Sequence, residues 1–181
     1  MVLPPIPNFP QIPCCTLQTV PACPEAPVAV LETARDKEAE LRVLAEALGP
    51  KLVVPEVWRD LLPHAGILIS SSISGGTLKN RFDEAIRTAP RRCWLLLEQM
   101  QMEFPLPCPD GTGRRITVIN YGNSFYSEAL CCQYTHFCCN HKGFMVLWDT
   151  RETLLTKLEL ARAIGFQGYV DFTVQKDEKS L

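Results

Sequence analysis

Residues 66–97 read GILISSSISGGTLKNRFDEAIRTAPRRCWLLL and carry the strongest structural signal in the chain. The apolar run Ile67–Ile69 predicts a strand over residues 66–72, and Thr77 is a residue type that favours the start of a helix. Apolar residues recur at helical spacing until Pro90, namely Leu78, Phe82, Ala85, Ile86 and Ala89. A second apolar run then begins at Cys93, so the stretch predicts a strand–helix–strand unit.

Similar units are predicted on both sides of this one. Upstream, apolar spacing predicts a helix over residues 31–48, ended by Gly49 and Pro50, then a strand over 51–54 and a helical turn over 57–62. Downstream, residues 93–104 predict one long strand. Strands over 144–148 and 168–174 enclose a helix over 150–164, and between these blocks we expect a strand over 116–119, a short helix over 125–131 and a strand over 133–138.

Strands that alternate with helices of this length predict an α/β fold with a mostly parallel sheet and right-handed βαβ units. A barrel-like or truncated (β/α) barrel is preferred, and an open layered α/β sheet is the alternative. Residues 1–27 contain eight of the fifteen prolines and predict an extended arm that packs partly on the body. Residues 28–175 are expected to form a single α/β domain, and residues 176–181 a polar tail.

Composition narrows the classes of function. The 181 residues are 46% apolar and 21% charged with a net charge of −2, which is typical of a globular domain and argues against nucleic-acid binding. No run of 18 apolar residues predicts a membrane span, and residues 1–34 lack the Lys or Arg of a secretory leader. Nine cysteines, an odd number, favour free thiols and a cytoplasmic location.

Acidic and hydroxyl side chains follow the predicted strands, where ligands of parallel α/β folds bind. The candidate catalytic residues are Glu98, Asp149 and Asp171, with Ser70–Ser72 at the same edge. On a regular strand Glu98 shares an apolar face with Trp94 and Leu96, which would raise the pKa of its carboxyl group and suit a general acid. Alternatively, a bulge changes this face or an arginine pairs with Glu98.

Each remaining candidate also has a structural interpretation. Asp149-Thr150-Arg151-Glu152 matches a helix-capping box, so capping by Asp149 is favoured over catalysis. Ser74–Thr77 is either a turn with an N-cap or an anion site. Histidines and cysteines between Cys131 and His141 are interpreted as buried thiols beside surface histidines, with zinc as the alternative. No cofactor and no resident metal are predicted.

The segment Phe144-Met145-Val146-Leu147-Trp148-Asp149-Thr150-Arg151-Glu152-Thr153-Leu154, continuing through Lys157-Leu158-Glu159-Leu160-Ala161 to Gly165-Phe166-Gln167-Gly168, resembles the last βαβ unit of chitinase-like (β/α)8 glycosidases of the family-18 type. The resemblance covers about 30 residues of the 181. The acidic signature D-x-x-D-x-D-x-E of these enzymes is absent, so their catalytic residues do not transfer to this chain. The resemblance implies a truncated or degenerate relative without hydrolase activity.

Two hypotheses for function follow. The first is a divergent or inactive glycosidase-like domain with a cleft for a carbohydrate or another small molecule, in which Glu98 is the acid and Asp149 or Asp171 the second carboxylate. The second is a noncatalytic protein-interaction module that docks through the proline-rich arm and the cysteine-rich segment. Glycoside cleavage requires two carboxyl groups about 5 to 10 Å apart, so the placement of these acids discriminates between hydrolysis and binding.

Overall fold

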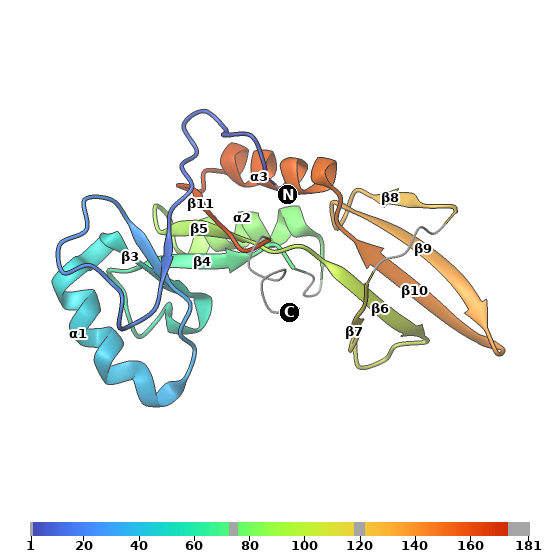
Figure 1. Ribbon diagram of the computed structural model, residues 1–181, viewed down its shortest axis with the longest axis horizontal. Coiled ribbons are helices and arrows are strands. Elements are labelled where there is room, and N and C mark those ends of the chain that lie inside the picture. Colours follow the sequence, from blue (N-terminus) through green and yellow to red (C-terminus); the bar gives the residue numbers. More distant parts are fainter. Residues whose placement is uncertain (1, 73–75, 118–121, 174–181) are drawn as a thin grey trace.

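The computed structural model describes residues 2–72, 76–117 and 122–173. Six strands form a sheet in the order β1-β2-β3-β4-β5-β11, and every neighbouring pair is parallel. The strands are β1 (Cys14–Cys15), β2 (Val28–Val30), β3 (Leu52–Pro55), β4 (Gly66–Ser70), β5 (Cys93–Leu97) and β11 (Tyr169–Asp171). This confirms the predicted α/β class and its parallel sheet (Figure 1).

The proline-rich arm nearly closes this sheet into a barrel. Gln11 forms a parallel bridge with Tyr169 of β11, and β1 follows on the same arm beside β2. The backbone NH of Ile12 donates to the Tyr169 carbonyl at 2.9 Å, and the Tyr169 NH donates to the Pro10 carbonyl at 3.0 Å. A proline has no backbone NH to donate, but its carbonyl can accept a hydrogen bond, as that of Pro10 does here. The prolines of the arm are therefore compatible with pairing along β11. The arm is therefore part of the sheet.

A narrow interior follows from the small number of strands. One buried side chain from the arm and one from each of five strands fill it, namely Ile12, Ala29, Val53, Leu68, Trp94 and Val170. Trp94 is the largest of them, and two glycines give it room. A Cβ atom on Gly66 would lie 2.9 Å from Trp94 Nε1, and one on Gly168 would lie 2.6 Å from Trp94 Cζ3.

Helices cover the outer face of the barrel. They are α1 (Glu38–Leu48), α2 (Leu78–Thr88) and α3 (Arg151–Ile164), with short 3-10 turns at Arg35–Lys37, Gly49–Lys51 and Glu56–Trp58. Their buried residues, such as Leu41, Phe82 and Leu154, pack in one cluster against outward-facing strand residues such as Ile67 and Leu95. In the described parts of the chain no helix has the length and apolar character needed to cross a membrane.

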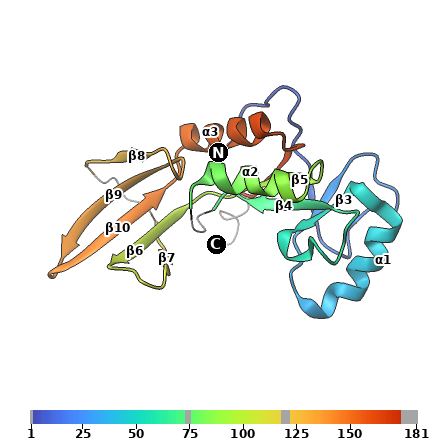
Figure 2. The same cartoon turned by 180° about the vertical axis from the view of Figure 1, so that it is seen from behind.

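A second, antiparallel sheet is inserted between β5 and α3. Its order is β7-β6-β10-β9-β8, formed by β6 (Gln101–Leu106), β7 (Arg114–Arg115), β8 (Phe125–Ser127), β9 (Cys132–Cys139) and β10 (Lys142–Trp148). It extends away from the barrel, as Figures 1 and 2 show from two sides. The strands expected over 133–138 and 144–148 are therefore confirmed, but they run antiparallel and lie outside the parallel sheet.

Two predicted elements were wrong, and a third begins later than expected. The single strand over 93–104 is two strands in different sheets, because the chain leaves the barrel after Leu97 and an unbroken apolar run does not reveal that change. The helix over 125–131 is strand β8 followed by a turn. The helix expected over 31–48 is confirmed as α1, but it begins at Glu38 after the 3-10 turn at Arg35–Lys37, and the Glu32 carboxylate accepts the backbone NH groups of Thr33 and Ala34 before that turn.

The remaining elements agree with the sequence apart from their ends. Thr77 caps α2 by accepting the Asn80 NH, and β3, β4 and α3 lie where they were expected. Of the strand expected over 116–119, Ile116 and Thr117 are not in a strand, and the next two residues lie outside the described part. The last strand ends at Asp171, and Val174 also falls outside that part.

Gly168→Ala tests the packing of the interior. The added methyl group would overlap Trp94 and the Pro10 carbonyl, so we expect a loss of about 1–3 kcal/mol in the free energy of unfolding, measured by urea denaturation. Gly122→Ala is the control, because a Cβ atom there meets nothing within 4 Å. Equal stability of the two variants would contradict a filled interior.

Candidate functional site

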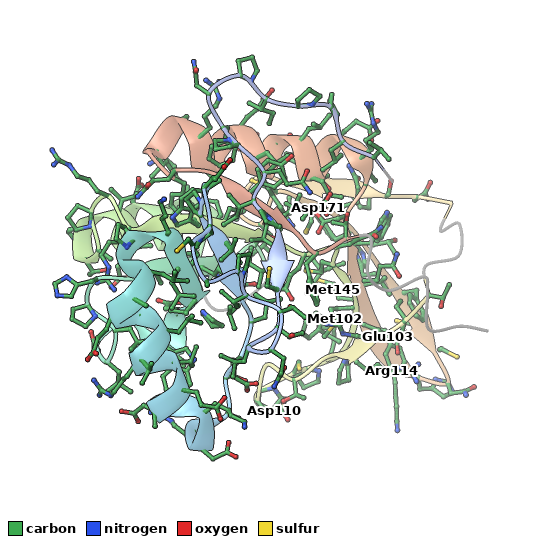
Figure 3. The ribbon with its side chains drawn as sticks, turned by 60° about the vertical axis from the view of Figure 1, so that its left-hand side comes forward. Met102, Glu103, Asp110, Arg114, Met145 and Asp171 are labelled. Carbon is green, nitrogen blue, oxygen red and sulfur yellow. The ribbon has the colours of Figure 1, made fainter. Side chains whose placement is uncertain are left out.

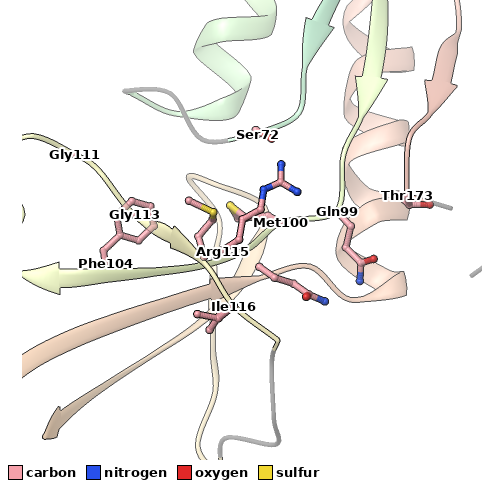
Figure 4. A pocket seen from close by; sticks show the side chains of 11 residues that line it. Ser72, Gln99, Met100, Phe104, Gly111, Gly113, Arg115, Ile116 and Thr173 are labelled. Carbon is pink, nitrogen blue, oxygen red and sulfur yellow. The ribbon is translucent and has the colours of Figure 1, made fainter. Parts of the chain in front are cut away.

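A cavity of about 460 Å³ lies at the carboxyl end of the parallel strands, beside the antiparallel sheet. Its polar residues include Ser72 after β4, Gln99 after β5, Thr173 after β11 and Arg115 on β7. Met100, Met102, Phe104 and Ile116 supply apolar surface (Figure 4). This is the edge at which ligands of parallel α/β folds bind.

Glu98 lies at the barrel mouth and is held by serine hydroxyl groups. The hydroxyl groups of Ser70 and Ser72 donate to Glu98 Oε2 at 2.5 and 2.9 Å, and the backbone NH of Glu98 donates to Ser71 Oγ at 2.9 Å. The carboxylate is therefore held by uncharged donors, and the predicted alternative of an arginine partner does not apply.

Arg81 of α2 fixes the end of β4. Its guanidinium group donates to the carbonyls of Ser70, at 3.0 Å, and Ser72, and burial lowers the pKa of this guanidinium group from its usual value. Both Ser70 and Ser72 are thus anchored through the backbone on one side and through Glu98 on the other. Their hydroxyl groups are preorganised before any ligand arrives.

Asp171 occupies the opposite face of the barrel wall. It pairs in register with Leu97, whose side chain belongs to the core beneath the helices, whereas Glu98 hydrogen-bonds to Ser70 on the interior side. The Asp171 carboxylate accepts the NH of Thr173 at 2.9 Å and its hydroxyl at 2.5 Å. Asp171 therefore holds a loop that borders the cavity.

Asp149 forms a fully buried ion pair with Lys157 of α3. Lys157 Nζ lies 2.7 Å from Asp149 Oδ1, and neither side chain is exposed. Asp149 also accepts the Thr153 hydroxyl at 2.8 Å and the Met100 NH at 2.9 Å. The capping box predicted for Asp149 and Glu152 was wrong, because Thr150 is the N-cap and exchanges hydrogen bonds with Thr153.

The structure therefore separates the three acids predicted from the sequence. Each acid accepts a hydrogen bond from a different residue that lines the cavity. The donors are the Ser72 hydroxyl group for Glu98, the Thr173 hydroxyl group for Asp171 and the Met100 backbone NH for Asp149. None of the three carboxylate residues lines the cavity itself. Three of the residues that line the cavity, Ser72, Met100 and Thr173, are hydrogen-bond partners of these acids, and a role of the acids at the cavity stays a prediction.

Sequence reasoning missed the contribution of the antiparallel sheet. Met102, Phe104 and Arg115 all lie on one face of it, because Met102 pairs with Arg115 and Phe104 follows two residues later on the same strand. The alternation of Gln101 to Phe104 was visible in the sequence. It was assigned to an extension of the barrel strand, which concealed its relation to Arg115.

All nine cysteines are free thiols. Among the described residues no group of three or more His, Cys, Asp or Glu side chains is placed to hold a metal ion, so the cysteine-rich segment gives no support to the zinc alternative. Cys138 and Cys139 are exposed, whereas Cys131 and Cys132 are buried. Of the segment Ser74–Thr77, interpreted as a turn with an N-cap or alternatively as an anion site, Thr77 is the N-cap of α2, and residues 74 and 75 lie outside the described part.

The fold is similar to that of solved glycosidase-like structures. The spore cortex-lytic enzyme SleL of Bacillus cereus matches with a TM-score of 0.52 and 10% identity over 82% of this chain and 45% of its own. A chitinase of Chromobacterium violaceum matches with a TM-score of 0.56 and 14% identity over 85% of this chain and 63% of its own. A Bacillus subtilis structure described as a sporulation-specific glycosylase, ydhD, has a TM-score of 0.50, 14% identity and coverages of 80% and 63%.

At these identities the similarity shows a shared barrel-like α/β fold, and this chain spans less than two-thirds of each neighbour. No protein-family model matches the sequence, and neither does any curated protein. The glycosidase-like barrel that the resemblance implied is thus supported at the level of fold, although the strand over residues 144–148 lies in the antiparallel sheet and is not a barrel strand. The narrower assignment to the family-18 type remains a proposal.

Asp149→Asn tests the buried ion pair. The substitution leaves the Lys157 ammonium group buried without a charged partner, so we expect the free energy of unfolding to fall by about 3–5 kcal/mol. Lys79→Ala, which removes the exposed pair with Asp83, is the control and should have a much smaller effect. Chemical denaturation of both variants measures the difference, and equal losses would contradict the role of Asp149.

Alkylation of the cysteines tests the burial of the thiols. Burial raises the pKa of Cys93 to about 11 and that of Cys132 to about 12, so both remain protonated and shielded at pH 8. We expect iodoacetamide at pH 8 to label Cys23, Cys138 and Cys139 within minutes, and to label Cys93 and Cys132 only after denaturation. Peptide mass spectrometry identifies the sites, and early labelling of Cys132 would contradict the packing.

Proposed function

We propose that the cavity at the barrel mouth is a saccharide-binding cleft of a glycosidase-like domain that binds rather than cleaves its ligand. The observation that carries this proposal is the cavity itself, in which fixed hydroxyl and amide groups stand beside Met and Phe side chains. Sugars present both hydroxyl groups and apolar ring faces, and sites of this mixed character bind such ligands. The glycosidase-like structural neighbours support the same ligand class.

The hydroxyl groups of Ser72 and Thr173 set the polarity of the cleft. Ser72 donates its proton to Glu98 and Thr173 donates its proton to Asp171, which leaves their oxygen lone pairs available as acceptors. Gln99 and Gln101 add amide groups that both donate and accept. A ligand must therefore offer hydrogen-bond donors to the two oxygens, as the hydroxyl groups of a saccharide do.

The antiparallel sheet extends the apolar side of the cleft. Met102, Phe104 and Met145 share one face of this sheet with Tyr134 and stay partly exposed. Phe125 continues the surface, with its ring 5.6 Å from that of Tyr134 and 6.3 Å from that of His136. A row of aromatic rings leading away from the cavity suits several sugar units better than one.

The placement of the acids favours binding over hydrolysis. Asp149 forms a buried ion pair with Lys157. Asp171 lies on the face of the barrel sheet that the helices cover, whereas Glu98 lies on the face toward the barrel interior. Of the three, Glu98 is the one we propose at the saccharide, through its hydrogen bonds to the serines. Without a second carboxylate from this set, the pair that glycoside cleavage requires is not assembled.

The interaction-module hypothesis has less support. It relied on a free apolar arm, but Leu3, Phe9 and Ile12 of the arm are buried in this chain. Phe9 also stacks on Tyr169, with ring centroids 5.6 Å apart. The arm thus packs within its own chain.

Phe104→Ala tests the cleft. We expect the wild-type chain to bind a trimer of N-acetylglucosamine in isothermal titration calorimetry, without release of reducing ends in a parallel assay. Removal of the Phe104 ring should weaken the affinity by about tenfold, since burial of such a ring contributes about 1.5 kcal/mol or more. Val43→Ala, on the exposed face of α1, is the control and should leave the affinity unchanged.

Absence of binding of the trimer and of larger oligomers by the wild type would overturn the proposal. Turnover that disappears in Glu98→Gln would contradict its noncatalytic part and assign Glu98 as a catalytic acid instead.

A further inference from the structure

Among the described residues that line the cavity, Arg115 is the one that carries a charge. It pairs in register with Met102, which places both side chains on the cavity side of the sheet. Figure 4 shows the Arg115 side chain reaching from β7 into the space below Ser72. The residue remains exposed to solvent, so a ligand has access to its guanidinium group.

The neighbouring Arg114 differs from Arg115 in that it forms an ion pair within the sheet. Arg114 lies on the opposite face, and its guanidinium group contacts Glu103 Oε1 at 2.7 Å through both Nε and one terminal nitrogen. Figure 3 shows Glu103 and Arg114 side by side. By contrast, none of the carboxylates in the described ranges lies within ion-pair distance of Arg115.

We propose that the cleft selects saccharides that carry a carboxylate, and that Arg115 binds this group. The inference rests on the saccharide-binding function proposed above and specifies its ligand class. The guanidinium group is a planar fork of donors that matches the two oxygens of a carboxylate. Ser72 and Thr173 accept hydroxyl protons from the same ligand, so an acidic sugar satisfies the acceptors and the cation together.

A carboxylate fits this cleft better than a phosphate. Phosphate sites usually combine several cations or a set of backbone NH groups at a helix start, whereas this cavity offers one guanidinium group. Glu98 and Asp171 also lie directly behind Ser72 and Thr173 and oppose a higher negative charge. A carboxylate carries a single negative charge, so one guanidinium group is enough to balance it. When the carboxylate points toward Arg115, it also points away from Glu98 and Asp171.

A matched pair of ligands tests the proposal. The probes are the trimer of N-acetylglucosamine and the same trimer with its 6-hydroxymethyl groups oxidised to carboxylates, titrated into the full chain by calorimetry at low salt. We expect the wild type to bind the oxidised trimer about tenfold more tightly, because a charge-assisted bidentate contact is worth about 1.4 kcal/mol or more. This preference should decrease with added salt.

Two variants assign the preference to one residue. Arg115→Gln should abolish the preference, which is the ratio of the two affinities and is therefore independent of any change that affects both trimers equally. Arg114→Gln is the matched control. It removes one positive charge from the adjacent position on β7, but Arg114 lies on the face of the sheet that points away from the cavity, so this variant should keep the preference. Arg115→Lys, which keeps the charge without the planar fork, should retain only part of it.

The outcomes separate this inference from the function on which it rests. Equal binding of the two trimers by the wild type, or a preference that survives in Arg115→Gln, would overturn the carboxylate site and leave the saccharide cleft standing. Failure of both trimers to bind would overturn both proposals. A preference that is lost equally in Arg114→Gln and Arg115→Gln would show a general effect of net charge and would also overturn the assignment to Arg115.

Discussion

The narrow interior of the six-stranded barrel is the constraint on which the other features depend. Few strands leave little internal volume, and Trp94 occupies much of it beside Gly66 and Gly168. A filled interior means that a ligand must bind above the barrel and not inside it. The mouth is therefore the place where polar groups of β4 and β5 become available, and Ser70 and Glu98 meet there.

The antiparallel sheet turns this mouth into a cleft. A barrel end alone would present a flat rim, but Met102, Phe104 and Arg115 stand beside it as a second wall. The two walls differ in chemistry, since the barrel side contributes hydroxyl groups backed by carboxylates and the sheet side contributes apolar surface and a cation. For the saccharide proposed above, this division favours one orientation of the ligand in the cleft.

The sequence predicted the barrel well because its signals are local. The run Ile67–Ile69, the cap at Thr77 and the apolar spacing of α2 each report on neighbours within a few residues, and the structure confirms them. The inserted sheet was harder to predict, because pairing of β6 with β10 joins residues about forty positions apart. Whether residues 93–104 stay in one sheet depends on that distant pairing, and period-two alternation looks the same in both cases.

The sequence predicted the acidic residues at the strand ends, whereas it did not predict which residues line the cavity. Glu98 and Asp171 both lie at strand ends, but the face of the sheet on which each side chain lies depends on the strand register. Asp171 pairs with Leu97, one residue before Glu98, so the side chains of Asp171 and Glu98 lie on opposite faces. Asp149 was recognised as a helix-start residue, while its true partner Lys157 lies two turns along α3. In the sequence Lys157 follows Leu154 by three residues, so helical spacing places this lysine beside the apolar stripe of α3.

The way in which the inserted sheet joins the barrel determines how firmly the sheet is held. The Asp149 NH donates to the Met100 carbonyl and the Met100 NH donates to the Asp149 carboxylate, both at 2.9 Å. These two hydrogen bonds join the chain where it leaves the barrel to the chain where it returns. The barrel strands on either side of that connection make their own ladder contacts. The insertion is also attached at a second place, because the Leu78 NH at the start of α2 donates to the Ala129 carbonyl at 2.8 Å and Cys131 packs in the core beneath the helices. Two separate attachments restrict rotation of the inserted sheet about the strand connection. The wall that this sheet adds to the cavity is therefore held at a fixed angle to the barrel mouth.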